Sequence, residues 1–517
     1  MARSTAGLRM GAGVAAAAVA LGVVQLTAAF FSPAADARTA VGTAVINVTP
    51  GPVKEWAIQT FGTADKLFLS VAVIAVIGAL AAVAAIWERS RIPVGTVAIL
   101  AAALVGSIAV LARPGARPID IIPTLLGAVC GIAVLRLLTS GRIADDRTAE
   151  TRTANQAGAA DVDPGRRLSL VTLGFAGLGL LSGVAGAVIS RRLNSVSGDR
   201  ENFALPSAPP PSPIPADVTP PGAGLPSFIT PNPDFYRIDT ALSVPQLSRA
   251  EFRLRVHGMV DREVTYTFDD LNKFEPITKV VTLTCVSNPV GGNLISNAEW
   301  TGYRVRDLLT ASGIHPDADM VLSTSVDGFT AGTPVEALTD GRESMLAIGM
   351  NGVPLPVEHG YPARLVVPGL YGYVSATKWV VDLELTRFDR TQAYWTKLGW
   401  AERGPIKTES RIDVPRSGQK VSKGAVTFGG VAWAQNRGVK AVEVRIDDGP
   451  WQQARLGAAY SNDAWRLWSF PWTATQAGFH TITARATDNT GAVQTEEQAP
   501  PAPDGATGWP SVSFEVD

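Results

Sequence analysis

The chain has 517 residues, of which 46% are hydrophobic and 18% are charged, and its formal net charge is −1. This length allows two or more domains beside a membrane portion, and the near-neutral charge gives no basic footprint for a nucleic-acid partner. Only two cysteines are present, Cys130 and Cys285, which leaves no disulfide framework.

Five apolar runs in the first 190 residues each approach the roughly 20 residues that a membrane-spanning helix requires. They cover 11–31, 67–87, 93–112, 118–138 and 168–190. Arg3 and Arg9 precede the first run, which could therefore be a signal peptide. It lacks a sharp cleavage context and four more runs follow, so an uncleaved span is favoured. The sequence predicts a membrane region over 1–192 with about five transmembrane helices.

The arginines between the runs predict an orientation. If the spans alternate in direction, one side of the membrane receives the arginines before the first run, after the second run, and between residues 136 and 167. Because positive residues concentrate on the cytoplasmic side, that side is predicted to be cytoplasmic. The rest of the chain is then extracytoplasmic. Arg166-Arg167-Leu-Ser-Leu resembles a twin-arginine export signal, with ordinary inside-flanking arginines as the alternative. Four arginines oppose this orientation: Arg113, Arg117, Arg191 and Arg192.

All four histidines follow residue 250, so the spans cannot hold a bis-histidine haem. This limits the membrane region to anchoring, quinone contact or partner binding. The Pro-rich segment 193–233 predicts an extended, semi-rigid linker.

Two folded domains are predicted after the linker. Over 234–411, alternating strands such as 252–257 mix with helical pieces such as 305–311, which favours a mixed α+β domain. Over 412–517, about seven short strands fit a β-sandwich of immunoglobulin type. Trp465, Trp468 and Trp472 fit core or interface aromatics better than cofactor contacts. The fold class is therefore α+β, with N-terminal transmembrane helices and a C-terminal sandwich.

Cys285 ends a β-rich run, Val-Val-Thr-Leu-Thr, and enters a loop rich in Gly, Asn and Pro. Such strand ends commonly carry chemistry. A soft thiolate is a suitable ligand for a redox metal. A buried cysteine that acts as a small hydrophobe is the alternative.

From about Phe235 to the C-terminus, several segments in chain order resemble the sulfite oxidase family of molybdopterin-dependent oxidoreductases. The resemblance implies a molybdenum-molybdopterin cofactor, Cys285 as metal ligand and catalytic residue, and a C-terminal domain that forms a homodimer. The segments are Asp-Phe-Tyr-Arg at 234–237, Thr-Leu-Thr-Cys-Val-Ser-Asn at 282–288, Ser-Val-Asp-Gly-Phe at 325–329, the Met-Asn-Gly-Val-Pro-Leu-Pro run at 350–369, and Thr-Lys-Trp at 377–379.

The resemblance also implies a set of cofactor contacts. A pterin phosphate needs cationic donors, and arginine can hold it by two parallel bonds. Taken singly, His359 could shape a turn and Arg364 could be a charge on a strand edge. Found together and in family order, they favour cofactor binding. The implied contacts are Tyr236, Arg237, Asp327, His359, Arg364, Thr377 and Lys378.

The chain departs from the sulfite-oxidising members at four places. They have Arg-Asn-His where this chain has Arg-Ile-Asp at 237–239, and Asn-Arg-Arg where it has Asn-Pro-Val at 288–290. Trp400 stands where they have a catalytic Tyr, and is taken as a second catalytic residue. Those enzymes also draw a basic residue from their C-terminal domain, whereas no arginine follows Arg485 in this sequence. Because a sulfite pocket needs convergent positive charge, these departures argue against sulfite as the substrate.

Three functions follow from these observations. The leading one is a membrane-anchored oxidoreductase that transfers an oxygen atom to or from a small extracytoplasmic substrate and exchanges electrons with a cytochrome or the quinone pool. The second is a quinol-linked reductase of S-oxides or N-oxides. The third is an anchored surface module that binds a partner and has a vestigial cofactor site.

Overall fold

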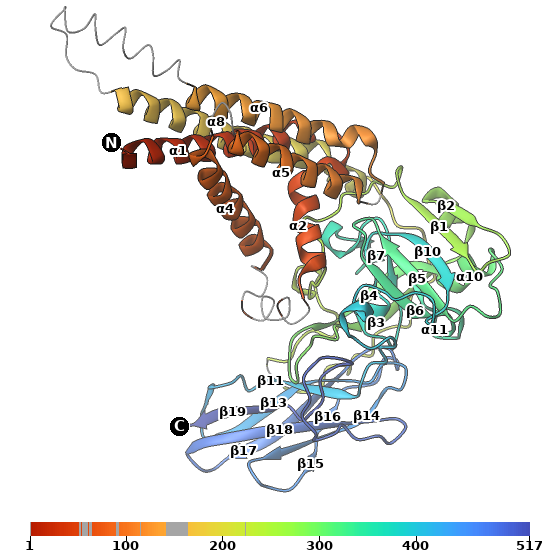
Figure 1. The fold of residues 1–517 in the computed structure, drawn as a ribbon. Helices are drawn as coiled ribbons and strands as arrows, with labels where there is room; N and C mark the ends of the chain where they lie inside the picture. Colours follow the sequence, from red (N-terminus) through yellow and green to blue (C-terminus); the bar gives the residue numbers. More distant parts are fainter. Residues whose placement is uncertain are drawn as a thin grey trace, which may run out of the picture. The chain divides into compact units, whose positions relative to one another are not determined.

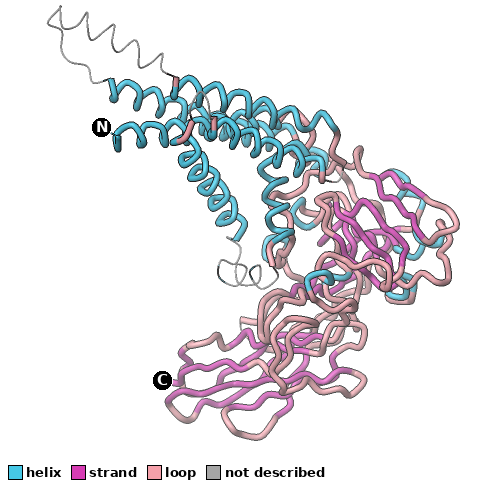
Figure 2. Tube along the Cα trace, in the orientation of Figure 1, coloured by secondary structure: helices cyan, strands magenta, loops and turns pink. Residues whose placement is uncertain are grey.

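The computed structural model of the protein describes residues 2–50, 53, 60, 65–88, 93–113, 115–140, 164–222 and 224–517. The chain forms two compact units, Met1–Ser195 with Ala241–Gln246, and Val196–Thr240 with Leu247–Asp517. The first unit is helical and the second contains the strands (Figure 2). Much of the arginine pattern that predicts the orientation, including Arg89, Arg91 and 141–163, lies outside the described residues, as do the side chains of Arg166 and Arg167.

The first unit contains five helices that are long and apolar enough to cross a membrane. These are parts of α1, α4, α5, α6 and α8, which correspond to the five apolar runs of the sequence. Helix α2 is shorter and was not predicted. The bounds are α1 (Ala2–Ala28), η1 (Pro33–Ala35), α2 (Ala37–Val48), α4 (Asp65–Ile86), α5 (Val94–Leu111), η3 (Pro118–Ile121), α6 (Ile122–Thr139) and α8 (Pro164–Leu193).

Helix α1 packs against α4, α6 and α8, and runs alongside α6 and α8 (Figure 1). Small residues allow this close approach. A Cβ on Gly22 would clash with the carbonyl of Gly179, and a Cβ on Gly179 would clash with the backbone of Ala18. Helix α1 is therefore packed closely within the helical bundle.

The α+β half of the second unit has two sheets. One has the order β2-β1-β10-β5-β6, and the other has the order β3-β4-β7-β8 with β9 paired to β7. The bounds are α9 (Ser197–Glu201), η4 (Asn232–Asp234), β1 (Arg253–Gly258), β2 (Val264–Thr267), η5 (Asp269–Lys273), β3 (Pro276–Thr284), β4 (Ile295–Arg304), α10 (Val305–Thr310), β5 (Met320–Ser325), β6 (Thr330–Pro334), α11 (Val335–Thr339), β7 (Met345–Met350), β8 (Val353–Pro354), η6 (Val357–His359), β9 (Arg364–Val366), η7 (Gly372–Val374), β10 (Val380–Thr386) and η8 (Thr396–Leu398).

The C-terminal half of this unit is a sandwich of two sheets, β11-β13-β17-β16 and β12-β19-β18-β14-β15. Trp468 and Phe514 are fully buried in its core, whereas Trp465 is buried in the main hydrophobic core. The predicted fold class is confirmed. The bounds are β11 (Glu409–Val414), β12 (Lys420–Val421), β13 (Gly424–Trp433), β14 (Val439–Ile446), β15 (Gln452–Gln453), β16 (Arg455–Leu456), β17 (Arg466–Ala474), β18 (Gly478–Asp488) and β19 (Ser511–Val516).

The Pro-rich segment differs from the spacer expected of it. From residue 196 onward it belongs to the second unit, and Val218 and Phe228 are buried in the main hydrophobic core. Arg200 donates from Nε to the carbonyl of Leu355 at 2.8 Å. The prolines keep the segment extended, but the apolar residues among them gain more from burial than from exposure.

Candidate functional site

Cys285 is the first residue after β3 and begins the loop that leads to β4. Strands β3 and β4 are antiparallel and pair Thr284 with Ile295 at this end. The Cys285 amide donates to the carbonyl of Leu294 at 2.9 Å, which closes the loop at its base. The thiol is partly exposed, and burial raises its pKa. The strand pair therefore fixes the position of a lone thiol at the end of a sheet.

Asn288 supports the same loop. Its side-chain Oδ1 accepts from the backbone amide of Leu294 at 2.8 Å, and its backbone amide donates to the Cys285 carbonyl at 3.1 Å. Its Nδ2 is buried and has no partner within the described part of the chain. A buried unpaired donor is costly unless another group accepts from it. Asn288 thus offers a free hydrogen-bond donor three residues after the thiol.

Two buried cations lie side by side near this loop. Arg364 opens β9 and forms an isolated bridge with Lys378. Their exposed fractions are 5% and 8%. Arg364 donates from Nη1 to the carbonyl of His359 at 3.1 Å, and no described carboxylate pairs with it. Burial lowers the pKa of Arg364 to about 10 and the pKa of Lys378 to about 8.

A neutral residue, His359, and a carboxylate, Asp239, lie beside these cations. Burial lowers the pKa of His359 to about 3, and the neighbouring Arg364 and Lys378 add to the effect, so the imidazole is neutral. The Asp239 carboxylate accepts from Lys378 Nζ at 2.7 Å and from Arg237 Nε at 2.9 Å. One carboxylate thus pairs with two cations, and the third cation, Arg364, has no carboxylate partner among the described residues, which leaves an excess of positive charge for an anion.

Two phenols lie near Cys285. Burial raises the pKa of Tyr236, and the charge of Cys285 raises it further. Burial likewise raises the pKa of Tyr371, with contributions from the Glu409, Asp504 and Cys285 charges. The sequence predicted Tyr236. It did not single out Tyr371, because that residue meets the loop only through tertiary packing.

The other predicted site residues take different positions. Thr377 is buried and hydrogen-bonds to Ser323 Oγ at 2.7 Å. Asp327 lies in the turn between β5 and β6, where its Oδ1 accepts from the amide of Phe329 at 3.3 Å. Trp400 is buried in the hydrophobic core, 5.9 Å from the Tyr373 ring between centroids. Its catalytic role stays a prediction.

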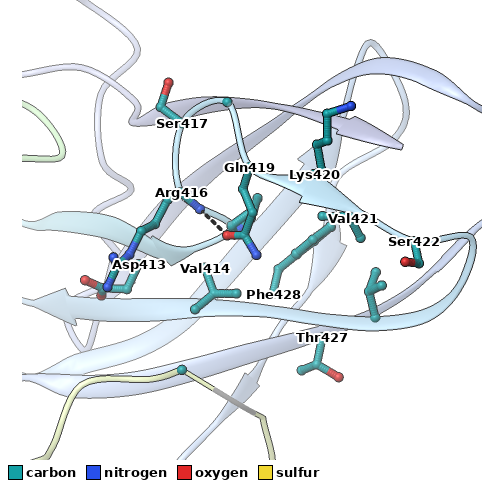
Figure 3. Close-up of a pocket in the computed structure, with 14 residues that line it drawn as sticks. Asp413, Val414, Arg416, Ser417, Gln419, Lys420, Val421, Ser422, Thr427 and Phe428 are labelled. Carbon is teal, nitrogen blue, oxygen red and sulfur yellow. Dashed lines mark hydrogen bonds between the residues drawn. The ribbon is translucent and has the colours of Figure 1, made fainter. Parts of the chain in front are cut away.

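A cleft of about 790 Å³ lies elsewhere, on the C-terminal sandwich (Figure 3). Asp413, Arg416, Lys420 and Phe428 are among its lining residues, and the Arg416 amide donates to Gln419 Oε1 at 2.9 Å. It shares no residue with the group around Cys285. The candidate site is therefore defined by its side-chain chemistry rather than by cavity size.

Two known families match the part of the chain after residue 240. Residues 241–395 match the family described as "Oxidoreductase molybdopterin binding domain", and residues 409–484 match the family described as "Bacterial Ig domain". The two matches fall on the α+β half and on the sandwich.

Curated relatives point the same way. The chain is 30% identical over 324 residues to the mitochondrial sulfite oxidase of Homo sapiens, a match that covers 53% of this chain and 58% of the human protein. It is 30% identical over 154 residues to the uncharacterized oxidoreductase YuiH of Bacillus subtilis (strain 168), covering 30% of this chain and 74% of that one. The solved sulfane dehydrogenase SoxCD from Paracoccus pantotrophus matches with 27% identity and a TM-score of 0.46, over 52% of this chain and 74% of that one.

The side chains at the site fit the cofactor that these matches imply. Cys285 could supply a thiolate for a metal, and the cations around Arg364 could pair with a phosphate. The side-chain amide of Asn288 could add a hydrogen-bond donor that has no partner among the described residues. The chain belongs to the sulfite oxidase family of molybdopterin-dependent oxidoreductases.

Proposed function

We propose that the protein is a membrane-anchored molybdopterin-dependent oxidoreductase that transfers an oxygen atom to or from a small extracytoplasmic substrate. The chain covers only 58% of the human relative, so the activity and the partners are argued from its own residues. Its electrons pass to or from a separate carrier, a cytochrome or the quinone pool.

The observation that carries this proposal is a lone thiol beside a buried, under-neutralised group of cations. Cys285 can bind a metal only as the thiolate, and burial alone opposes that form. A coordinated cation reverses this preference, because a metal deprotonates a coordinating thiol. Arg364 is also buried and has no carboxylate partner among the described residues, and a phosphate would neutralise its charge.

The bound cofactor would supply the oxygen transfer and the redox change. The chain's residues have three other tasks. Cys285 holds the metal, and Arg364, Lys378 and Arg237 hold the anionic end of the pterin. Tyr236 and Tyr371 keep their protons at neutral pH, because burial raises both pKa values. They can therefore donate hydrogen bonds to a substrate oxygen next to the thiol loop.

Reduction of S-oxides or N-oxides with electrons from quinol is the second candidate. It is favoured by the lack of cations on the loop that follows the thiol, as distinct from the cations around Arg364 that would hold the cofactor. Pro289 and Val290 follow Asn288 where the sulfite-oxidising relatives have arginines. Lys407, which lies next to Tyr371, is paired with Asp504 at 2.9 Å. A pocket of phenols and paired charges suits a neutral substrate better than the sulfite dianion.

Two measurements on the purified full-length protein test these proposals. Metal analysis is expected to give about one molybdenum per chain, whereas its absence after expression with cofactor synthesis would favour the surface module with a vestigial site. Assays with a redox dye then compare sulfite oxidation with the reduction of methionine sulfoxide and N-oxides. Efficient sulfite oxidation would contradict the proposal that the substrate pocket carries little unpaired positive charge.

A further inference from the structure

The C-terminal sandwich presents polar residues to the strand that carries the thiol. Glu409 opens β11 and lies directly opposite Trp433 of β13, so the two side chains share one face of the sheet. Trp433 belongs to the same hydrophobic core as Tyr371. Gln435, two residues later, donates from Nε2 to Thr284 Oγ1 at 3.1 Å. Thr284 directly precedes Cys285, so this face adjoins the candidate site.

Three buried polar atoms, two on this face and one in the turn that follows β13, have no partner among the described residues. They are Glu409 Oε1, Trp433 Nε1 and Gln435 Oε1, in residues that are 4%, 0% and 1% exposed. Buried groups of this kind are normally paired, and internal water is the usual partner where several of them converge. The face therefore has the composition of a hydrated polar region inside an otherwise apolar core.

Glu409 is suited to hold a proton there. Burial raises its pKa to about 8, and Lys407 opposes this only in part. Tyr371 lies within electrostatic reach of both Glu409 and Cys285, since the charges of both raise its pKa. The ionisable groups around Glu409 are Lys407, Tyr371 and Asp504, together with Arg437 and Asp488, which bond to the neighbouring Thr408.

We propose that Glu409 is the proton-exchanging residue of the site, connected to the Cys285 loop through Tyr371 and internal water. This rests on the proposed function. Oxidation of a substrate S by oxygen transfer follows S + H₂O → SO + 2 H⁺ + 2 e⁻. The electrons leave to the carrier, and the two protons leave separately. Glu409 is protonated at neutral pH, so it first releases its proton toward solvent and then takes up one proton from the site. A second such cycle carries the second proton, and in the reductive direction the order is reversed.

Infrared spectroscopy of the full-length protein tests the proton on Glu409 without turnover. The wild type is expected to show a carboxylic-acid C=O band that shifts in D₂O and disappears as the pH rises through about 8. Glu409→Gln should lose this band. Asp413→Asn is the matched control, because Asp413 lies on the same strand, has an unpaired Oδ2, and has a pKa that burial raises. It should keep the band that titrates near 8.

Kinetics tests the role of that proton. The variants are compared at equal molybdenum content and melting temperature. Glu409→Gln should lower kcat by about 100-fold, which is the lower end of the range for a positioned proton-transfer group. It should also remove the limb of the pH profile near 8. Asp413→Asn should keep the wild-type kcat and the limb of the pH profile near 8. Absence of the band from the wild type, its persistence in Glu409→Gln, or an unchanged pH profile would overturn the proposal. If no substrate is turned over at all, that result contradicts the proposed function. The infrared spectrum still shows whether Glu409 holds the proton.

Discussion

At the scale of single residues, the two cysteines form a natural pair for comparison. Cys130 lies within helix α6 of the first unit, and Cys285 lies at the end of β3. We predict that Cys285→Ser abolishes turnover and leaves the fold intact, because it removes a soft ligand and little volume. Cys130→Ser should change neither. Activity assays and circular dichroism measure both variants, and wild-type activity in Cys285→Ser would show that the thiol is not the metal ligand.

Arg364 should act on cofactor retention rather than on substrate affinity. The residue is 5% exposed, and its guanidinium bonds only to backbone carbonyls among the described residues. Arg364→Ala should weaken cofactor binding by an amount on the order of 2 to 5 kcal/mol, the range for a lost buried charge partner. Molybdenum per chain after gel filtration measures this, with the exposed Arg403→Ala as control. Full cofactor with an altered KM would instead place Arg364 in the substrate pocket.

Lys378 gives a prediction for pH. Burial lowers its pKa from 10.5 to about 8, so between these values the unfolded chain binds more protons than the folded one. The free energy of unfolding of the cofactor-free protein should therefore rise as the pH rises from about 8 to 10.5, by roughly 2 to 3 kcal/mol from this residue. Lys378→Met should remove this contribution, and Lys397→Met at the surface should not. Melting curves over this window measure the difference, and equal slopes for all three proteins would refute it.

At the scale of elements, the sequence predicts some features and is silent on others. The five apolar runs, the Cys285 loop and the sandwich are visible because each depends on local composition or on a contiguous motif. Tyr371 and Glu409 are not visible, because their positions depend on packing between the sandwich and strands far away in the chain. The burial of Phe228 was missed for the same reason. A Pro-rich composition indicates an extended backbone but does not show what that backbone packs against.

The packing of α1 on α8 gives a prediction for an element pair. Gly179→Ala should destabilise the helical bundle, because the added Cβ would clash with the backbone of α1 at Ala18. Gly177→Ala is the matched control on the same helix, since a Cβ there meets nothing within 4 Å. Thermal aggregation of the detergent-purified protein compares the two variants. Equal melting temperatures would mean that α1 and α8 do not approach each other this closely.

At the scale of the whole molecule, the proposed arrangement has one consequence for cofactor loading. The pterin site lies in a unit that carries its own sandwich and hydrophobic core. If this unit functions outside the membrane, a cofactor made in the cytoplasm must bind before export. The unit must then cross in a folded state, which is the physical reason to connect the Arg166-Arg167 pair with a twin-arginine route.

The predicted orientation can be tested by thiol labelling of intact cells. In a Cys130→Ser background, Ser417→Cys places a thiol in an exposed turn of the sandwich, and Thr148→Cys places one in the arginine-rich segment between the fourth and fifth apolar runs. A membrane-impermeant maleimide should label Ser417→Cys in intact cells, because five spans put the second unit outside. It should label Thr148→Cys only after the cells are lysed. The parent protein with Cys285 alone sets the background, and the reverse pattern would place the catalytic unit in the cytoplasm.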